Sequence, residues 1–159
     1  MLSQLQRREE LRTNLAGIHN LAAEAIPRIR DRAGGALVAV SSVHAMATSN
    51  GMAAYAATKG AIVAMCRGLA LDHAREAIRV NALVPGSVDT PMLRASATRR
   101  HPDDPEAALA LWAERQPLGR IAQPMEVAQA IAFLASGLAS AITGTVLVVD
   151  AGLSARLAL

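Results

Sequence analysis

The sequence contains one tyrosine and one lysine, Tyr55 and Lys59, and only three residues separate them, although the chain has sixteen basic residues of the Lys and Arg types. Residues i and i+4 lie on the same face of a helix. An ammonium group beside a phenol stabilises the phenolate and lowers the phenol pKa from about 10, and the start of a helix adds positive potential. We therefore expect Tyr55 to exchange protons near neutral pH with help from Lys59. On spacing alone, an accidental surface pair is the favoured interpretation.

A lysine suits this task better than an arginine does. Its ammonium is compact and carries three rotatable donors, whereas the guanidinium is a planar fork. This difference offers a reason why a chain that otherwise uses arginine retains one lysine, at position 59.

Two further features lie at places where strands are expected to end. Ser42 follows the apolar run 36–41 and precedes Tyr55 by thirteen residues, and the pair Pro85 and Gly86 ends a second run. Ligands of open parallel sheets bind beyond the carboxyl ends of the strands. A hydroxyl at this edge could donate a hydrogen bond to a substrate carbonyl, so these segments are expected to form one site with Tyr55.

The elements that position these residues alternate between helix and strand. Apolar spacing, capping residues and Gly or Pro breaks predict helices at 11–31, 53–74 and 124–136 and strands at 36–41, 78–84 and 145–150. Residues 87–120 are expected to be irregular, with a short helix after Pro105. This order predicts an α/β fold with a parallel sheet.

Composition narrows the class of protein. The chain has 159 residues, 52% of them hydrophobic, which suffices for one domain with a core of small aliphatic side chains. No stretch resembles a membrane span or a signal peptide, and the single cysteine, Cys66, fits a reducing, cytoplasmic location and is expected in the core. The net charge of +3 lacks a basic patch with interleaved aromatics, so we expect no nucleic-acid partner. The histidines show no ligand spacing, so no metal site is expected. His44 lies two residues after Ser42 and could face the substrate, but a solvated loop residue is the favoured interpretation.

Six motifs together resemble the short-chain dehydrogenase/reductase family over nearly the whole chain. They are "NLAG" (14–17), "VSS" (40–42), "YAATK" (55–59), "IRVNALVPGSVDTPM" (78–92), "PLGRIAQPMEVAQAIAFLAS" (117–136) and "TGTVLVVDAG" (143–152). The resemblance implies a Rossmann-like doubly wound parallel sheet of which residues 1–159 form only the second half. It also implies that residues 91–120 contain the variable loop that covers the substrate.

The resemblance implies roles in NAD(P)-dependent interconversion of a secondary alcohol and a ketone. Tyr55 matches the acid/base, and Lys59 matches the lysine that lowers the tyrosine pKa and binds the nicotinamide ribose. Ser42 matches the residue that orients the carbonyl, and Asn14 matches the asparagine that holds a water in a proton relay.

The same resemblance implies a cofactor site and a small-molecule alcohol or ketone substrate. Pro85 and Gly86 look like the turn that lies against the nicotinamide, and Val88 and Thr90 look like the carboxamide anchors. The resemblance leaves the choice between NAD and NADP open, and it assigns no role to Asp89.

The sequence departs from the family pattern before Asn14. The family begins with a strand, a Gly-rich turn and a helix that hold the cofactor pyrophosphate, but Gly17 is the first glycine here. We therefore expect a truncated product or a mis-assigned start, ahead of a short protein that assembles with a partner or a non-catalytic remnant. The alternative function is a catalytically inactive interaction subunit.

Association is expected on two surfaces. The helices 11–31 and 53–74 are expected to pair in a homodimer or homotetramer, since family members pair them across a two-fold axis. The small residues that permit this approach are Ala56, Ala57, Gly60, Ala64 and Gly68. The strand 36–41 is expected to lack a neighbour on one edge, which favours pairing with another chain or aggregation.

Overall fold

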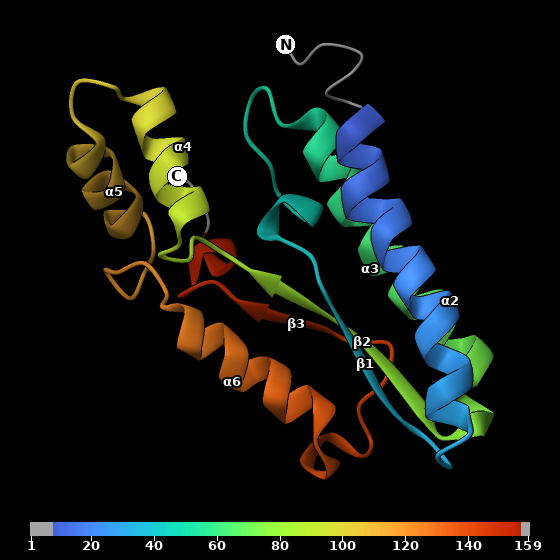
Figure 1. Cartoon of the computed structure of the whole chain (residues 1–159). Helices are drawn as coiled ribbons and strands as arrows, with labels where there is room; N and C mark the ends of the chain where they lie inside the picture. Colours follow the sequence, from blue (N-terminus) through green and yellow to red (C-terminus); the bar gives the residue numbers. More distant parts are fainter. Residues whose placement is uncertain (1–7, 157–159) are drawn as a thin grey trace.

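A computed structural model of the chain describes residues 8–156 and shows a three-layer α/β arrangement (Figure 1). Three parallel strands lie in the order β1-β2-β3, which confirms the predicted Rossmann-like fold class. Helices α2 and α3 cover one face of this sheet and α6 covers the other. The strands are β1 (Gly35–Val40), β2 (Ile78–Pro85) and β3 (Val146–Val149), and the helices are η1 (Leu11–Ala16), α2 (Gly17–Arg30), η2 (Val43–Ala45), α3 (Ala53–His73), η3 (Ala74–Glu76), α4 (Pro91–Arg100), α5 (Pro105–Glu114), α6 (Pro124–Ala135), η4 (Gly137–Ala139) and η5 (Leu153–Ala155).

The central strand β2 is buried along its length, as a strand covered on both faces must be. Its one amide, Asn81, donates to the carbonyl of Ile142 at 2.9 Å and accepts from the backbone N–H of Thr145 at 3.1 Å. The buried polar group is thereby satisfied, and it holds the segment that leads into β3 beside β2.

Small side chains form the core between α3 and the sheet. Ile62 and Cys66 of α3 pack against Val80 and Ala82 of β2, and all four are almost fully buried. Such short side chains let a helix lie close to a sheet without aromatic residues. The prediction that Cys66 belongs to the core is confirmed, and burial raises the pKa of its thiol to about 11.

The structure corrects the prediction for residues 87–120 in part. The short helix predicted at Pro105 is confirmed as α5, whereas α4 was not predicted, so the region is not largely irregular. Thr90 and Asp104 each accept a hydrogen bond from a backbone N–H in the first helical turn, and a proline follows each cap. Local capping therefore starts both helices, although α4 carries little apolar periodicity by which the sequence could have revealed it.

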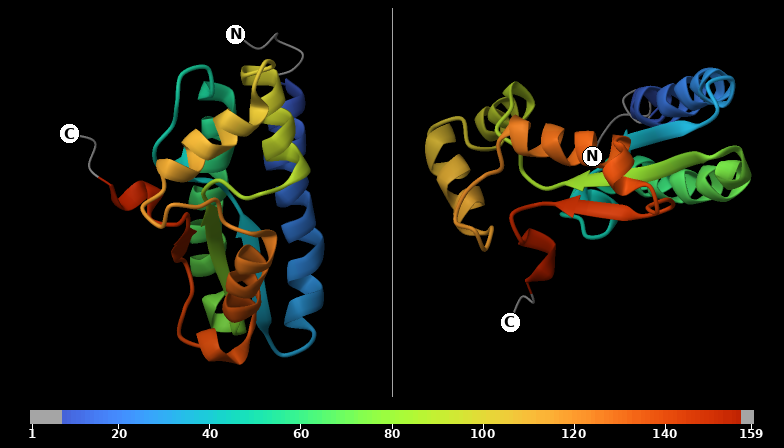
Figure 2. Two further views of the ribbon diagram at one scale, coloured as in Figure 1. Left: turned by 90° about the vertical axis from the view of Figure 1, so that its left-hand side faces the viewer. Right: turned by 90° about the horizontal axis from the view of Figure 1, so that it is seen from below.

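Helices α4 and α5 form a small unit of their own. Ala97, Ala108 and Leu109 are buried in a second cluster that is separate from the main core. Figure 2 shows the two helices beyond the carboxyl end of the sheet, away from α2.

Strand β1 lies at an edge of the sheet. It pairs with β2 from Gly35 to Val40, and no strand in the described part of the chain pairs with its other side. The prediction of an open edge on this strand is therefore confirmed for residues 8–156.

Candidate active site

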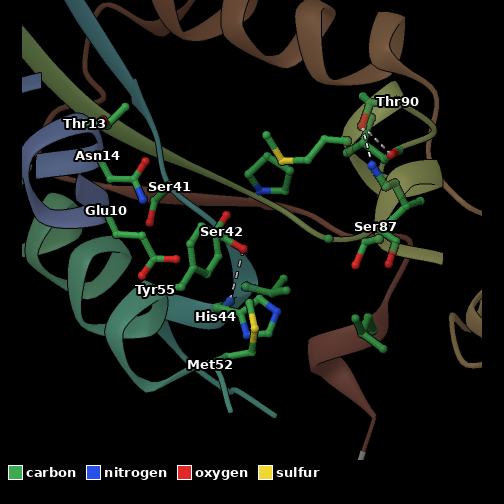
Figure 3. A pocket seen from close by; sticks show the side chains of 18 of the residues that line it. Glu10, Thr13, Asn14, Ser41, Ser42, His44, Met52, Tyr55, Ser87 and Thr90 are labelled. Atoms are coloured by element: carbon green, nitrogen blue, oxygen red, sulfur yellow. Dashed lines mark hydrogen bonds between the residues drawn. The ribbon is translucent and has the colours of Figure 1, made fainter. Parts of the chain in front are cut away.

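A cavity of about 800 Å³ lies at the carboxyl ends of β1 and β2. Seven of the eight predicted site residues line it, and they come from segments that are far apart in the sequence (Figure 3). They are Asn14, Ser42, Tyr55, Pro85, Gly86, Val88 and Thr90. The eighth, Lys59, is half-buried on α3, one turn after Tyr55, and is not part of the lining.

The strand end at Ser41 and Ser42 anchors one side of the cavity. The hydroxyl of Ser41 donates to the backbone carbonyl of Lys59 at 2.7 Å, which ties β1 to α3. The hydroxyl of Ser42 accepts from the backbone N–H of His44 at 3.3 Å and faces the cavity with Tyr55. Figure 3 shows Ser42 and Tyr55 adjacent, so one carbonyl oxygen could contact both hydroxyls.

The structure contradicts the expectation that Lys59 lowers the pKa of Tyr55. Burial raises the pKa of the Tyr55 phenol above its usual value near 10, while the nearby Ser42 hydroxyl lowers it to a smaller extent and the charge of Glu10 raises it. The Lys59 ammonium lies 5.6 Å from the centre of the tyrosine ring and donates to the carbonyl of Val40 at 3.3 Å. Burial also lowers the pKa of Lys59, because both groups are withdrawn from water.

Asn14 lies in the π-helical turn η1, a type of distortion that often occurs at functional sites. Its amide donates to the hydroxyl of Thr58 at 3.3 Å, and that hydroxyl donates to the carbonyl of Tyr55 at 2.7 Å. This chain of hydrogen bonds connects η1 to the first turns of α3. Asn14 therefore reaches the α3 helix through Thr58 rather than through a direct contact with Lys59.

The opposite side of the cavity is formed by the turn after β2. Gly86 lies so close to β3 that an added Cβ would come within 2.7 Å of the Cβ of Asp150. Thr90 donates to the carbonyl of Val88 at 3.3 Å and accepts from the N–H of Leu93 at 3.3 Å. Its hydroxyl thereby fixes both the turn and the start of α4.

Asp89, to which the sequence assigned no role, supports the same turn. Its carboxylate receives two hydrogen bonds from Arg94, at 2.8 and 2.9 Å, and Arg94 holds the pKa of this carboxyl below its usual value. Arg94 also lies 3.6 Å from Glu106, so the pair links the turn to both α4 and α5.

His44 corrects a second expectation, because it lines the cavity instead of lying in a solvated loop. Its ring meets the ring of Tyr55 edge-on, with centroids 5.5 Å apart and planes at 78°. Its Nδ1 lies 2.8 Å from the hydroxyl of Thr48. Its position two residues beyond Ser42 had indicated the alternative that His44 faces the substrate, and the structure favours that alternative.

Glu10 is a cavity residue that sequence reasoning missed altogether. It precedes Asn14 by four residues, so the two share a helix face, and this spacing could have identified it. Figure 3 shows its carboxylate beside Tyr55.

The described residues hold neither a group of three or more His, Cys, Asp or Glu side chains that could bind a metal ion nor a helix long and apolar enough to cross a membrane.

Known proteins match this chain along most of its length. A family model described as enoyl-(acyl carrier protein) reductase matches residues 2–154. Oxidoreductase UcpA of Salmonella typhimurium is 41% identical over 152 residues, which cover 95% of this chain and 58% of that protein. The chain thus spans little more than half the length of this relative.

Two solved structures extend the comparison to the fold. Ligand-free aldohexose dehydrogenase from Thermoplasma acidophilum superposes with a TM-score of 0.95 at 37% identity, over 99% of this chain and 63% of that one. A gluconate 5-dehydrogenase from Burkholderia cenocepacia, in complex with NADP and tartrate, gives a TM-score of 0.88 at 31% identity, over 98% of this chain and 59% of that one.

Proposed function

The chain belongs to the short-chain dehydrogenase/reductase family of oxidoreductases, and we propose that its cavity is the acid–base and nicotinamide half of an active site that interconverts a secondary alcohol and a ketone. The observation that carries this proposal is the convergence of Ser42 and Tyr55 from separate elements on one cavity at the carboxyl ends of parallel strands. The solved relative with NADP supports a nicotinamide cofactor, NAD or NADP.

In the proposed reaction, the hydroxyl of Tyr55 gives a proton to the ketone oxygen or takes one from the alcohol. Ser42 donates a hydrogen bond to the same oxygen and orients it. The Lys59 ammonium lies 5.6 Å from the centre of the tyrosine ring, and we assign its rotatable donors to the hydroxyl groups of the nicotinamide ribose. Asn14 continues the proton path toward the solvent.

The described residues fit one end of a nicotinamide dinucleotide. Pro85 and Gly86 line the cavity where a flat ring could lie against the turn, and Val88 and Thr90 present carbonyl and hydroxyl groups beside it. The bound nicotinamide supplies the hydride chemistry. No Gly-rich turn opens a helix toward this cavity among residues 8–156, so these residues provide no cradle for a pyrophosphate.

A competition experiment on the 159-residue chain can test whether it binds only the nicotinamide end of the cofactor. Reduced nicotinamide mononucleotide should bind in the cavity, and the fluorescence of the mononucleotide should change on binding. ADP-ribose should not compete, because residues 8–156 fit only the nicotinamide end. Titrations with NADH and NADPH then show whether either dinucleotide binds more tightly than the mononucleotide. Competition by ADP-ribose, or no binding of the mononucleotide, would contradict the proposal and favour an inactive interaction subunit.

We expect no turnover from the chain by itself, since most of the anchoring of a dinucleotide comes from its pyrophosphate and adenosine. Addition of a Gly-rich strand–turn–helix half, in cis or as a separate chain, should restore activity and also cover the open edge of β1. We call that preparation the complemented enzyme. Alcohol-dependent cofactor reduction by the short chain alone would overturn this expectation.

We also propose that the chain associates with itself through the outer faces of α2 and α3. Leu21 and Leu71 are 66% and 82% exposed on these helices, and the small residues Ala64 and Gly68 of α3 are also exposed. Sedimentation at micromolar concentration should show a homodimer or homotetramer, and Gly68→Arg should shift it toward the monomer.

A further inference from the structure

The carboxylate of Glu10 lines the cavity, but the proposed reaction gives it no role. Its Oε2 atom is buried and has no hydrogen-bond partner among residues 8–156. A buried carboxylate oxygen without a donor costs free energy, because water bound to it in the unfolded chain is not replaced. The cavity that Glu10 lines is the natural place for a donor to arrive.

The neighbouring glutamate provides a contrast. Glu9 also lines the cavity, but its carboxylate is engaged by the guanidinium of Arg12 at 2.8 and 3.2 Å and is exposed to solvent. The two adjacent carboxylates therefore differ. Glu9 accepts hydrogen bonds from Arg12, whereas the Oε2 atom of Glu10 has no donor among residues 8–156.

His44 offers a second hydrogen-bonding position in the same cavity. Its Nδ1 is taken by Thr48, and burial, aided by the charge of Arg100, lowers the pKa of its imidazole. The ring is therefore mostly neutral near pH 7, and its second nitrogen is left for a ligand. Figure 3 shows Glu10 and His44 on different sides of the Tyr55 ring.

The charges around the cavity favour an uncharged ligand. Arg99 lines the cavity together with Glu9 and Glu10, and Arg100 lies in an adjoining pocket with Glu10 and Tyr55. An anionic substrate would meet the two carboxylates, and a cationic one would meet the two guanidinium groups. A neutral molecule rich in hydroxyl groups avoids both repulsions and supplies the O–H donor that Glu10 lacks.

We infer that Glu10 and His44 bind hydroxyl groups on either side of the reacting carbon, so that the substrate is a neutral polyhydroxylated alcohol or its ketone. This inference rests on the proposed function, because the reacting oxygen is taken to lie at Tyr55 and Ser42. The Glu10 carboxylate accepts from one neighbouring hydroxyl, and the free nitrogen of His44 exchanges a hydrogen bond with another.

The test uses ligand binding without cofactor, so that it is independent of turnover. Saturation-transfer NMR on the 159-residue chain compares cyclohexanol with cyclohexane-1,2,3-triol, which differ only in the added hydroxyls. The triol should bind at least about tenfold more tightly, since a site built for hydroxyl groups discriminates against their absence. Glu10→Leu should bring the ratio close to one, and His44→Phe should reduce it partly. The control Glu24→Gln, at an exposed glutamate of α2 outside the cavity, should leave it unchanged.

Thermal stability separates ligand binding from a structural role. Glu10→Leu removes a carboxylate oxygen that has no partner, so the variant should melt at or above the temperature of the parent chain. A structural role would instead lower the melting temperature and leave the binding ratio intact. Equal binding of triol and cyclohexanol by the parent chain, or a ratio unchanged in Glu10→Leu, overturns the inference. The mononucleotide experiment reports separately on the proposed function.

Discussion

The two sides of the cavity are built in different ways. The acid–base wall is made of Asn14, Ser42 and Tyr55, with Lys59 behind them. It is held by hydrogen bonds between elements that are far apart in the sequence, such as those from Asn14 to Thr58 and from Ser41 to Lys59. The loop wall, residues 86–100, is held mainly by side-chain bonds that are local to the turn and the first helical turn, and its backbone bonds to distant segments reach Ala122 and Val149.

This difference matches two different tasks. Long-range bonds fix the acid–base wall on the main core, where a proton donor must be positioned within a few tenths of an ångström. The loop wall is supported by the small cluster between α4 and α5, and its Met92 is 76% exposed. Few buried contacts make a segment easier to displace, so we expect the loop wall to adapt to the substrate.

The largest effect is expected at the centre of the acid–base wall. In the complemented enzyme, Tyr55→Phe should lower turnover about 10²- to 10⁴-fold, the usual contribution of a positioned proton donor, and leave cofactor affinity nearly unchanged. Alcohol-dependent reduction of NAD or NADP measures the first quantity, and fluorescence titration measures the second. Substantial residual turnover would remove Tyr55 from its proposed role.

Lys59→Arg tests the same wall while conserving the charge. The half-buried ammonium fits between the Tyr55 ring and the carbonyl of Val40, and a planar guanidinium cannot occupy this space in the same way. We expect turnover in the complemented enzyme to fall by roughly 10²-fold. Arg67→Lys, an exposed exchange on the same helix, is the matched control and should change little. If Lys59→Arg retained most activity, the explanation for the single lysine would be wrong.

Gly86 lies at the start of the loop wall and packs against Asp150, and its replacement tests this contact. Gly86→Ala places a Cβ within 2.7 Å of Asp150 and 2.9 Å of its Cα, so β2 and β3 must separate. We expect a loss of about 1–3 kcal/mol in the free energy of unfolding, measured with urea. Gly68→Ala has open space on α3 and should instead gain roughly 0.5–1 kcal/mol. Equal stability of the two variants would show that the contact at Gly86 is unimportant.

The same contrast explains what the sequence could reveal. The acid–base wall was predictable because Tyr55 and Lys59 have a helical spacing and Ser42 ends an apolar strand. The α4 helix was not, since its start depends on Thr90 and Pro91 rather than on an apolar stripe. The raised pKa of Tyr55 and the unpartnered Glu10 depend on burial, which arises only when distant segments pack together.

A smaller effect is expected from Thr90 on the loop wall. Thr90→Val removes the cap of α4 and the bond to Val88, at a cost of about 1 kcal/mol in the free energy of unfolding. In the complemented enzyme KM should rise several-fold while kcat changes less, because the loop wall binds rather than reacts. Thr98→Val, an exposed change within α4, is the control. A fall in kcat that exceeded the rise in KM would place Thr90 with the acid–base wall.

The smallest expected effect is a shift in the pKa of the Tyr55 phenol, which lies in the acid–base wall. Because the chain has a single tyrosine, its tyrosinate absorbance near 295 nm reports only on this phenol. Burial raises the folded-state pKa above the ordinary value of 10.0, so the folded chain should titrate at higher pH than the urea-unfolded chain. A raised folded-state pKa means that the phenol's contribution to stability is fully present below pH 10 and is lost as the pH rises through the folded-state pKa. Lys59→Met should leave the elevation in place, whereas Glu10→Gln should reduce it, because the charge of Glu10 opposes the phenolate. A folded-state pKa below that of the unfolded chain, restored upward by Lys59→Met, would show that Lys59 and not burial governs the proton donor.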